Sequence, residues 1–248
     1  CGVSLTYSIE RNIMRVTGEG EMYNYNSDNL PPWNLLSDTI EKVELTEALT
    51  TIGSYSFHNF SKLTSISIPS NITSIGDGAF QLCTSLTTIT IPPKVTSLGE
   101  FLFNDCSDLE SIDIQGDVTE IGKYCFGSCS SLAAIIIPSS VELIESNAFT
   151  NCRRLQSITI PSKVTKIEEC LFENCRSIES IEILGDLEAI GKRSFAFCTS
   201  LVLITVPGSN SNQLQFLSNS QMVTIPSKVS TIDESLFEGC SSLSSIEI

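Results

Sequence analysis

Basic side chains are scarce in this chain of 248 residues. It contains 14 lysines and arginines against 29 aspartates and glutamates, so its formal net charge at pH 7 is -15. Nucleic acids and anionic lipid surfaces attract proteins through positive charge. The composition therefore predicts that neither nucleic acid nor an anionic membrane surface is a partner.

Long apolar runs are also missing. The longest run, around residues 133–137, is far shorter than the roughly 20 residues that span a bilayer, so no membrane insertion is predicted. The N-terminus has no basic region followed by an apolar stretch, which is the pattern of a secretory signal. Because the chain stops six residues into a repeat at Ile248, without a polar cap, we expect the natural protein to extend further.

Groups that usually carry catalysis are nearly absent. His58 is the single histidine, and no sequence partner for a triad or a zinc centre accompanies it, so we predict a surface residue. Cys125 and Cys129 are spaced C-x-x-x-C and not C-x-x-C, and no phosphate-binding glycine loop occurs. We therefore predict no enzyme, with no catalytic residue, no cofactor and no metal.

Acidic pairs leave one alternative to this prediction open. Glu110 with Asp113, and Glu179 with Glu182, recur at corresponding places along the chain. Carboxylate oxygens are calcium ligands, but acidic surface residues are usually only solvated. We favour the solvated surface.

A repeat of 23 residues dominates the sequence. LTSISIPSNITSIGDGAFQLCTS (Leu63–Ser85) is followed directly by LTTITIPPKVTSLGEFLFNDCSD (Leu86–Asp108). A fixed period of this length is typical of a solenoid, in which every unit buries its apolar side against its neighbours. The unit begins anew at residues 40, 63, 86, 109, 132, 155, 178 and 220, with an irregular stretch at 201–219 and a partial unit at 243–248.

Phenylalanine and cysteine recur at fixed positions of this unit. We predict that successive coils stack them into two interior ladders, with phenylalanine at position 18 and cysteine at position 21. Eight of the twelve phenylalanines belong to the first ladder: Phe57, Phe80, Phe103, Phe126, Phe149, Phe172, Phe195 and Phe237. The second contains Cys83, Cys106, Cys129, Cys152, Cys175, Cys198 and Cys240, and Phe60 takes that position in the first unit.

We predict that the ladder cysteines are reduced. Coils about 4.8 Å apart would need local distortion to bring Cβ atoms to the 3.8 Å or so of a disulfide. A free thiol behaves as a small buried hydrophobic group. Cys1, Cys125 and Cys170 lie outside the ladder, and their redox state is left open.

Each unit predicts the same course of the backbone. The opening L-x-x-I-x-I favours a short strand with positions 4 and 6 inward, and proline at position 7 ends it. A second extended segment follows at V-x-x-I. In A-F-x-x-C, positions 18 and 21 are three apart, so we expect a short helical turn. The stacked strands should form a parallel sheet on one side, as in leucine-rich repeats.

The unit closely resembles the BspA-like leucine-rich repeat, L-x-x-I-x-I-P-x-x-V-x-x-I-G-x-x-A-F-x-x-C. The head of the chain, from Cys1-Gly2 through Thr17–Met22 to Pro32-Trp33, is similar to the N-terminal region of that family. This resemblance implies a leucine-rich repeat solenoid and a secreted or cell-surface protein that adheres to host matrix proteins or cells. It does not identify the ligand.

Residues 1–39 are predicted to form a β-rich N-terminal cap on a solenoid of residues 40–248. Two strand-like pieces, Ser4–Ile9 and Ile13–Thr17, predict a hairpin over the first coil. We expect Trp33 to pack on that coil, with ligand binding as the alternative. For residues 201–219, a decayed repeat is favoured over a loop that serves binding.

The outward strand positions predict the contact surface. Positions 3 and 5 face out when 4 and 6 face in. The predicted protein-binding residues are Thr88, Thr90, Ser111, Asp113, Ala134, Ile136, Ser157, Thr159, Leu203 and Met222. They would bind a protein, such as a host matrix or cell-surface protein. The alternative is a structural spacer that presents another domain beyond residue 248.

Overall fold

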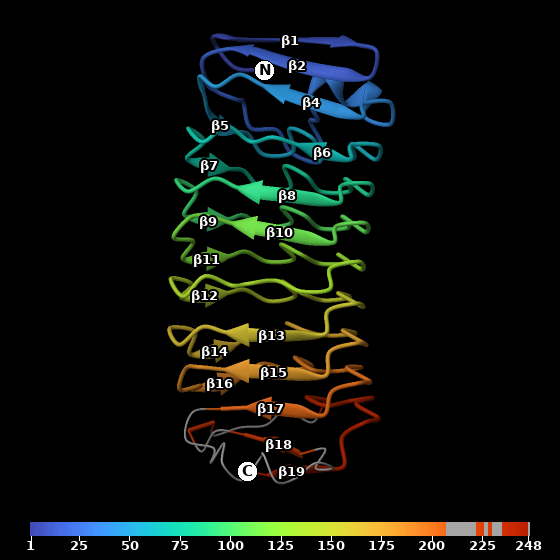
Figure 1. Cartoon of the computed structure of the whole chain (residues 1–248), viewed down its shortest axis with the longest axis vertical. Coiled ribbons are helices and arrows are strands. Elements are labelled where there is room, and N and C mark those ends of the chain that lie inside the picture. Colours follow the sequence, from blue (N-terminus) through green and yellow to red (C-terminus); the bar gives the residue numbers. More distant parts are fainter. Residues whose placement is uncertain (207–221, 226–227, 230–234, 248) are drawn as a thin grey trace.

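The structure, a computed structural model, describes residues 1–206, 222–225, 228–229 and 235–247. Its coils are stacked into a solenoid with the N-terminus at one end (Figure 1). Most coils carry a strand, a second short strand and a turn segment, so three rows of stacked backbone run along the molecule. We name each coil by its first residue, from the Ile40 coil onwards.

The first row consists of parallel strands with isoleucines facing inward. Ile112 aligns with Ile89, one 23-residue repeat earlier, and Ile181 aligns with Ile158. Ile89, Ile158 and Ile181 are buried, as the sequence predicts for position 4. The strands are β4 (Lys42–Leu45), β6 (Ser65–Ile66), β8 (Thr88–Ile91), β10 (Ser111–Ile114), β13 (Ser157–Ile160), β15 (Ser180–Ile183), β17 (Leu203–Thr205), β18 (Met222–Thr224) and β19 (Ser245–Glu247).

The second extended segments also pair in parallel and form their own row of short strands. Most of the two-residue strands end on a buried apolar residue at position 13, such as Ile75, Ile121 or Ile144. The row contains β5 (Leu49–Ile52), β7 (Ser74–Ile75), β9 (Ser97–Leu98), β11 (Glu120–Ile121), β12 (Leu143–Ile144), β14 (Lys166–Ile167) and β16 (Ala189–Ile190), with β3 (Gly20–Glu21) before them.

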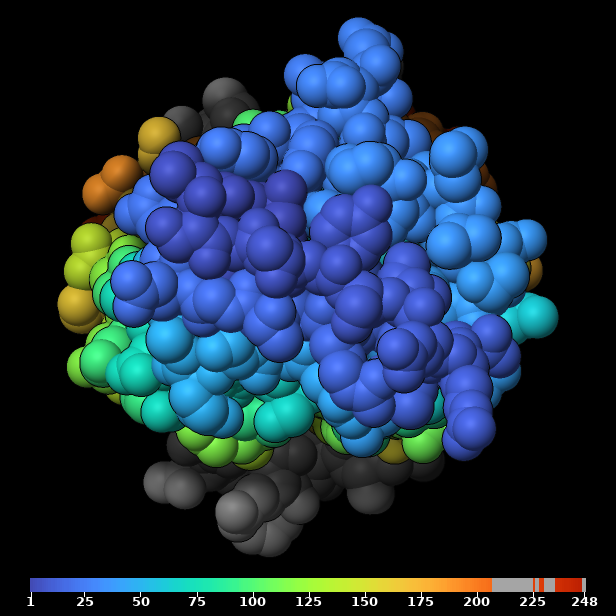
Figure 2. All heavy atoms as spheres, turned by 90° about the horizontal axis from the view of Figure 1, so that it is seen from above, coloured from blue at the N-terminus to red at the C-terminus, as the bar shows by residue number. Residues whose placement is uncertain are grey.

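A hairpin closes the N-terminal end of the stack, as predicted. β1 (Leu5–Glu10) pairs antiparallel with β2 (Ile13–Gly18), and β2 continues the first row by pairing with β4. The short 3-10 helix η1 (Pro32–Leu36) places Trp33 against the first coil, where its Nε1 donates to the Ser56 carbonyl at 2.7 Å. Figure 2 shows this N-terminal region, in blue, spread over the end of the stack. Trp33 is 1% exposed, so it packs as expected and is not available to a ligand.

The turn segments form a third row, and the expectation of a short helix there is wrong. Alternate N–H groups donate to the next coil instead of to their own, for example Phe103 to Cys125 at 2.8 Å. Positions 16 and 20 have positive φ, which interrupts an α-helix. These residues are Tyr55, Gly78, Phe101, Tyr124, Asn147, Cys170 and Arg193 at position 16, and Asn59, Leu82, Asp105, Ser128, Asn151, Asn174, Phe197 and Gly239 at position 20.

The predicted phenylalanine ladder is continuous. Neighbouring rings stack from Phe57 to Phe237 at centroid distances of 5.3 to 6.1 Å. Seven of the eight rings are fully buried, and Phe237 is partly buried near the last coil. Such offset aromatic stacks add to the free energy gained from burial alone.

The cysteine ladder has a second role besides filling space. Each ladder thiol donates to the carbonyl of the phenylalanine in the preceding complete coil, as Cys129 Sγ does to Phe103 at 3.2 Å and Cys152 Sγ to Phe126 at 3.1 Å. The same contact recurs from Cys83 to Cys240. All ten cysteines are free. A thiol thus combines apolar volume with a weak donor at this position.

Within the part of the chain that the structure describes, the irregular unit adds a strand to the first row but no turn to the third. β17 lies between β15 and β18 in the first row. In the third row, however, Phe195 donates directly to Leu236 at 3.2 Å, and Phe195 stacks on Phe237. The predicted decay of this repeat concerns mainly residues 207–219, which lie outside the described residues.

Candidate functional site

The predicted strand-face residues lie on two separate sheets with one coil between them. Thr88 pairs with Ser111 and Thr90 with Asp113 on the first sheet, and their side chains are exposed. Further along, Ser157 and Thr159 are exposed on β13, Leu203 is half-buried, and Met222 pairs with it through the backbone. Ala134 and Ile136 lie on the Leu132 coil between the two sheets, and both are exposed.

The Leu132 coil departs from the sheet on this face. The first-row sheets end at β10 before it and begin again at β13 after it. Residues 134–137 make no backbone hydrogen bond to the preceding or the following coil within the described chain. Next to them, Gln156 N donates to Ala133 O at 3.2 Å. Ala133 and Ala134 are weak strand formers, which agrees with the loss of pairing. Ile136 is 87% exposed, so an apolar side chain and unpaired backbone groups share this site.

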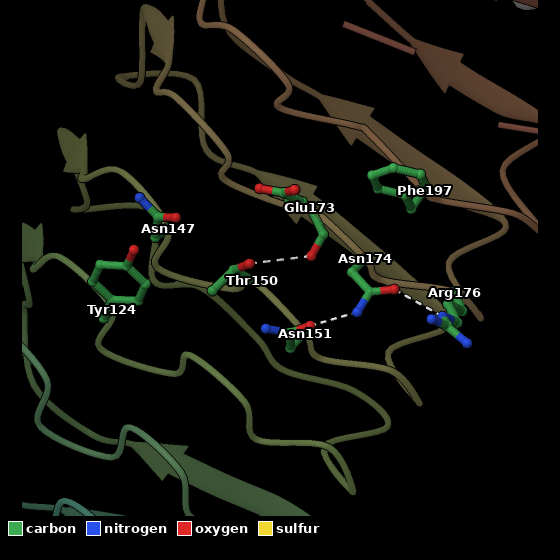
Figure 3. A pocket seen from close by; sticks show the side chains of 8 residues that line it. All are labelled: Tyr124, Asn147, Thr150, Asn151, Glu173, Asn174, Arg176 and Phe197. Atoms are coloured by element: carbon green, nitrogen blue, oxygen red, sulfur yellow. Dashed lines mark hydrogen bonds between the residues drawn. The ribbon is translucent and has the colours of Figure 1, made fainter. Parts of the chain in front are cut away.

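The turn side carries a groove that the sequence did not predict. It has a volume of about 500 Å³ and runs over four consecutive coils, from Tyr124 on the Leu109 coil to Phe197 on the Ile178 coil. Figure 3 shows these two rings at opposite ends, with Asn147, Asn151 and Asn174 between them.

Hydrogen bonds organise the middle of the groove. Asn174 Nδ2 donates to Asn151 Oδ1 at 2.5 Å, and Arg176 Nε donates to Asn174 Oδ1 at 2.7 Å (Figure 3). The Glu173 carboxylate is held by Arg193 at 2.6 Å. These contacts fix the polar side chains on neighbouring coils in one arrangement.

His58 is not the surface residue that the sequence analysis expected. It is half-buried beside Tyr55, with ring centroids 5.6 Å apart, and its Nδ1 is buried without a hydrogen-bond partner. Burial lowers the pKa of His58, and a hydrogen bond with Gln81 opposes that shift. No carboxylate orients the ring among its described contacts, so its environment is that of a packing residue.

Two of the three cysteines outside the ladder, Cys125 and Cys170, are not activated nucleophiles. Cys125 is fully buried, and burial raises its pKa well above the ordinary range. Cys170 is half-buried, and burial together with Glu173 and Glu169 raises its pKa to about 12. A reactive cysteine needs a lowered pKa, so neither thiol is suited to catalysis at neutral pH.

The acidic pairs of the strand side remain in solvent. Glu110, Asp113, Glu179 and Glu182 are exposed. Among the described residues, no three His, Cys, Asp or Glu side chains gather closely enough to hold a metal ion. Within the same described segments, no helix has the length and apolar character that a membrane crossing requires.

Comparison with known sequences decides the family. The profile of the BspA type leucine rich repeat region matches residues 36–152 and 119–243, in six copies. The chain belongs to this family. Among curated proteins, none matches it. A BspA-type solenoid offers extended faces, which repeat proteins use for binding other proteins.

Solved structures share the fold of this BspA-type chain. The pneumococcal vaccine antigen PcpA is similar with a TM-score of 0.52 and 17% identity, over 99% of this chain and 80% of that chain. A leucine rich cell surface protein from Faecalibacterium prausnitzii A2-165 is similar with a TM-score of 0.47 and 21% identity, over 100% and 93%. The leucine rich repeat protein of T. pallidum matches with a TM-score of 0.48 and 24% identity, over 87% and 94%.

Proposed function

We propose that this chain is the protein-binding module of a secreted or cell-surface protein, and that it attaches to host matrix proteins or cells through its strand face around Ile136. The observation that carries the proposal is the 87% exposure of Ile136 on a coil that has left the sheet. An exposed apolar side chain with a polar surround is typical of a recognition surface.

The surroundings of Ile136 support this assignment. Thr90 and Asp113 on one side, and Thr159 on the other, present hydroxyl and carboxylate groups at equivalent outward positions. Unpaired backbone groups of residues 134–137 add donors and acceptors that an extended segment of a partner can satisfy. A protein partner therefore fits this face better than a small apolar ligand does.

Two further resemblances support placement at the cell surface. A solved structure with the same fold is described as a leucine rich cell surface protein, and another as a vaccine antigen. The spacer function is the second candidate, because an uninterrupted row of stacked rings makes a stiff rod that can hold another domain away from a surface.

An Ile136→Glu variant tests the contact surface. A buried charge in the interface should weaken binding to an immobilised protein by about tenfold or more, because about 1.4 kcal/mol corresponds to each factor of ten. Surface plasmon resonance on collagen, laminin and fibronectin measures this. Ser67→Glu is the matched control, because Ser67 occupies the same exposed position 5 on the Leu63 coil.

Three outcomes distinguish the candidates. Loss of binding with Ile136→Glu but not with Ser67→Glu supports the proposed face. Equal binding by both folded variants contradicts it. If the unaltered chain binds neither the three matrix proteins nor cultured host cells, the adhesion proposal fails and the spacer function is favoured.

A further inference from the structure

We propose that the groove on the turn side, from Tyr124 to Phe197, binds a short neutral oligosaccharide. This site is separate from the strand face and uses a different row of each coil. Its volume of about 500 Å³ falls within the usual range of ligand sites, which is roughly 300 to 1,000 Å³. The groove is elongated along the stack, so it suits a linear ligand made of similar units.

The two ends of the groove are aromatic. Tyr124 and Phe197 stand three coils apart, which is roughly 14 Å at the usual spacing between strands. The Tyr124 ring stacks on Phe101 at 5.3 Å, which fixes its plane from the side of the preceding coil. The Phe197 ring is held by Arg193, whose guanidinium carbon lies 5.4 Å from the ring centroid. Both rings are thus supported as rigid platforms.

The backbone at these two residues is unfavourable for large side chains. Tyr124 has φ 53 and Phe197 has φ 60, a region that L-residues other than glycine, asparagine and aspartate rarely adopt. Neighbouring coils show less costly solutions at the same positions, with Asn147 at position 16 of the following coil and Asn174 at position 20 of the preceding coil. Because Phe101 and Leu82 share this backbone conformation outside the groove, it is a property of the repeat, and the groove differs in placing aromatic rings at both of its ends.

Planar polar groups fill the space between the rings. Asn151 Nδ2 and the Asn147 amide donate to no group in the described chain, and each can bind a ligand oxygen. The Glu173 carboxylate, although paired with Arg193, keeps further acceptor capacity. Neighbouring donors and acceptors of this kind match the adjacent hydroxyl groups of a sugar ring.

A departure from the repeat occurs at the same place. Position 22 carries a hydroxyl in the other coils with a described position 22, and from Thr84 onwards that hydroxyl donates to the preceding position 22, as Thr84 does to Ser61 and Ser130 to Ser107. The Leu132 and Leu155 coils carry arginine instead, as Arg153 and Arg176. Both are exposed, and Arg176 lines the groove. The hydrogen bond from position 22 to the coil before it is thus absent in the coil where the long side chain of Arg176 reaches the groove.

These groups together favour a neutral saccharide. Aromatic rings pack against the C–H faces of pyranose units, while amides, a carboxylate and a guanidinium bind hydroxyl groups. One carboxylate beside Arg176 and Arg193 leaves the groove without a strong excess of either charge. The net charge of -15 on the whole chain disfavours a polyanionic sugar. The coil spacing and the length of a linked pyranose unit are also similar.

Isothermal titration calorimetry with four tetrasaccharides tests the proposal. Cellotetraose, maltotetraose and N-acetylchitotetraose are the neutral probes, and tetragalacturonate is the acidic one. We expect at least one neutral probe to bind, and Tyr124→Asn to weaken it by about tenfold through loss of one stacking platform. Tyr55→Asn is the matched control, because Tyr55 occupies the same position 16 with φ 55 and lies outside the groove.

A second pair guards against misfolded variants. Arg176→Ser restores the hydroxyl that other coils carry and should also weaken binding, while Ile136→Glu should leave it unchanged. The proposal is overturned if no neutral probe binds at millimolar concentration, if only tetragalacturonate binds, or if Tyr124→Asn and Tyr55→Asn affect binding equally. Because the strand-face test uses protein partners and a different residue, either proposal can fail without the other.

Discussion

The strand side and the turn side of the Leu132 coil behave differently although they belong to the same 23 residues. On the strand side the sheet stops at β10 and resumes at β13. On the turn side Phe126 N still donates to Ala148 O at 2.9 Å, and Phe149 N donates to Leu171 O at 3.1 Å. Where the first-row sheet is interrupted, the stacking of coils therefore depends on the turn side, with its buried rings and thiols, and on the pairing of β12 with β11.

This difference separates stability from recognition. Buried phenylalanines of consecutive coils contact one another, so a change at one of them affects two neighbours. Outward residues of the strand side contact mainly solvent, so they can vary without loss of the fold. A repeat protein can thus change its binding surface while its stacking stays the same.

The largest expected effect on the turn side is a loss of stability at alkaline pH, caused by its buried thiols. Burial raises the pKa of Cys83 from 9.0 to about 12, and it raises the pKa of Cys106, Cys129, Cys175 and Cys198 well above 9.0. Thiols stay protonated in the fold, while the unfolded chain loses these protons above pH 9.0. The protonated thiols therefore contribute their full stabilisation of the fold below pH 9.0, and this contribution is lost as the pH rises toward 12.

Each such thiol should lower the free energy of unfolding by about 1.4 kcal/mol per pH unit in that window. Urea denaturation between pH 8 and 10.5 measures the effect. A Cys129→Ala variant should show a shallower decline than the unaltered chain, because one titrating group is removed. A decline that does not differ between the two chains would contradict the ladder as its origin.

The next effect is the loss of one ring from the phenylalanine ladder. Phe126→Ala should lower the free energy of unfolding by about 3 to 5 kcal/mol, because it leaves a cavity between Phe103 and Phe149. Chemical denaturation measures the change. Ile136→Ala, on the strand side of the following coil, should stay within about 0.5 kcal/mol. A loss below about 1 kcal/mol for Phe126→Ala would mean that the turn side does not dominate stacking.

The smallest effect concerns the gap in the sheet. Ala134→Thr with Ile136→Thr copies the outward pair Thr88 and Thr90 of the Leu86 coil and raises strand propensity, which should add up to about 1 kcal/mol to the free energy of unfolding. Hydrogen exchange of the amides at residues 134–137 should slow if pairing is restored. Unchanged exchange with unchanged stability would show that Ala134 and Ile136 do not cause the gap.

Much of the fold could be predicted from one sequence because each position recurs many times. Inward isoleucines, the phenylalanine and cysteine ladders, the buried Trp33 and the hairpin of β1 and β2 are all confirmed. The helical turn was wrong because a spacing of three suits both a helix and a tight turn. Gly78, Asn147 and Asn174 were the available signal, since glycine and asparagine favour positive φ.

The candidate sites were less predictable. Exposure of Ile136 follows from strand alternation, but the loss of pairing around it depends on backbone positions in three coils. The groove required knowing which turn residues of four coils lie together, and periodicity alone treats those residues as variable. Arg153 and Arg176 at a hydroxyl position were the one sequence signal of the groove.

The unit between β15 and β18 has a consequence for the path of the molecule. Three strands, β15, β17 and β18, stack in the first row where the turns around Phe195 and Phe237 contribute two layers. An extra layer on one flank, with none on the opposite flank among the described residues, should tilt the axis toward the thinner flank. A solenoid can therefore change direction by omitting half of a coil, and whatever follows such a coil points along a new line.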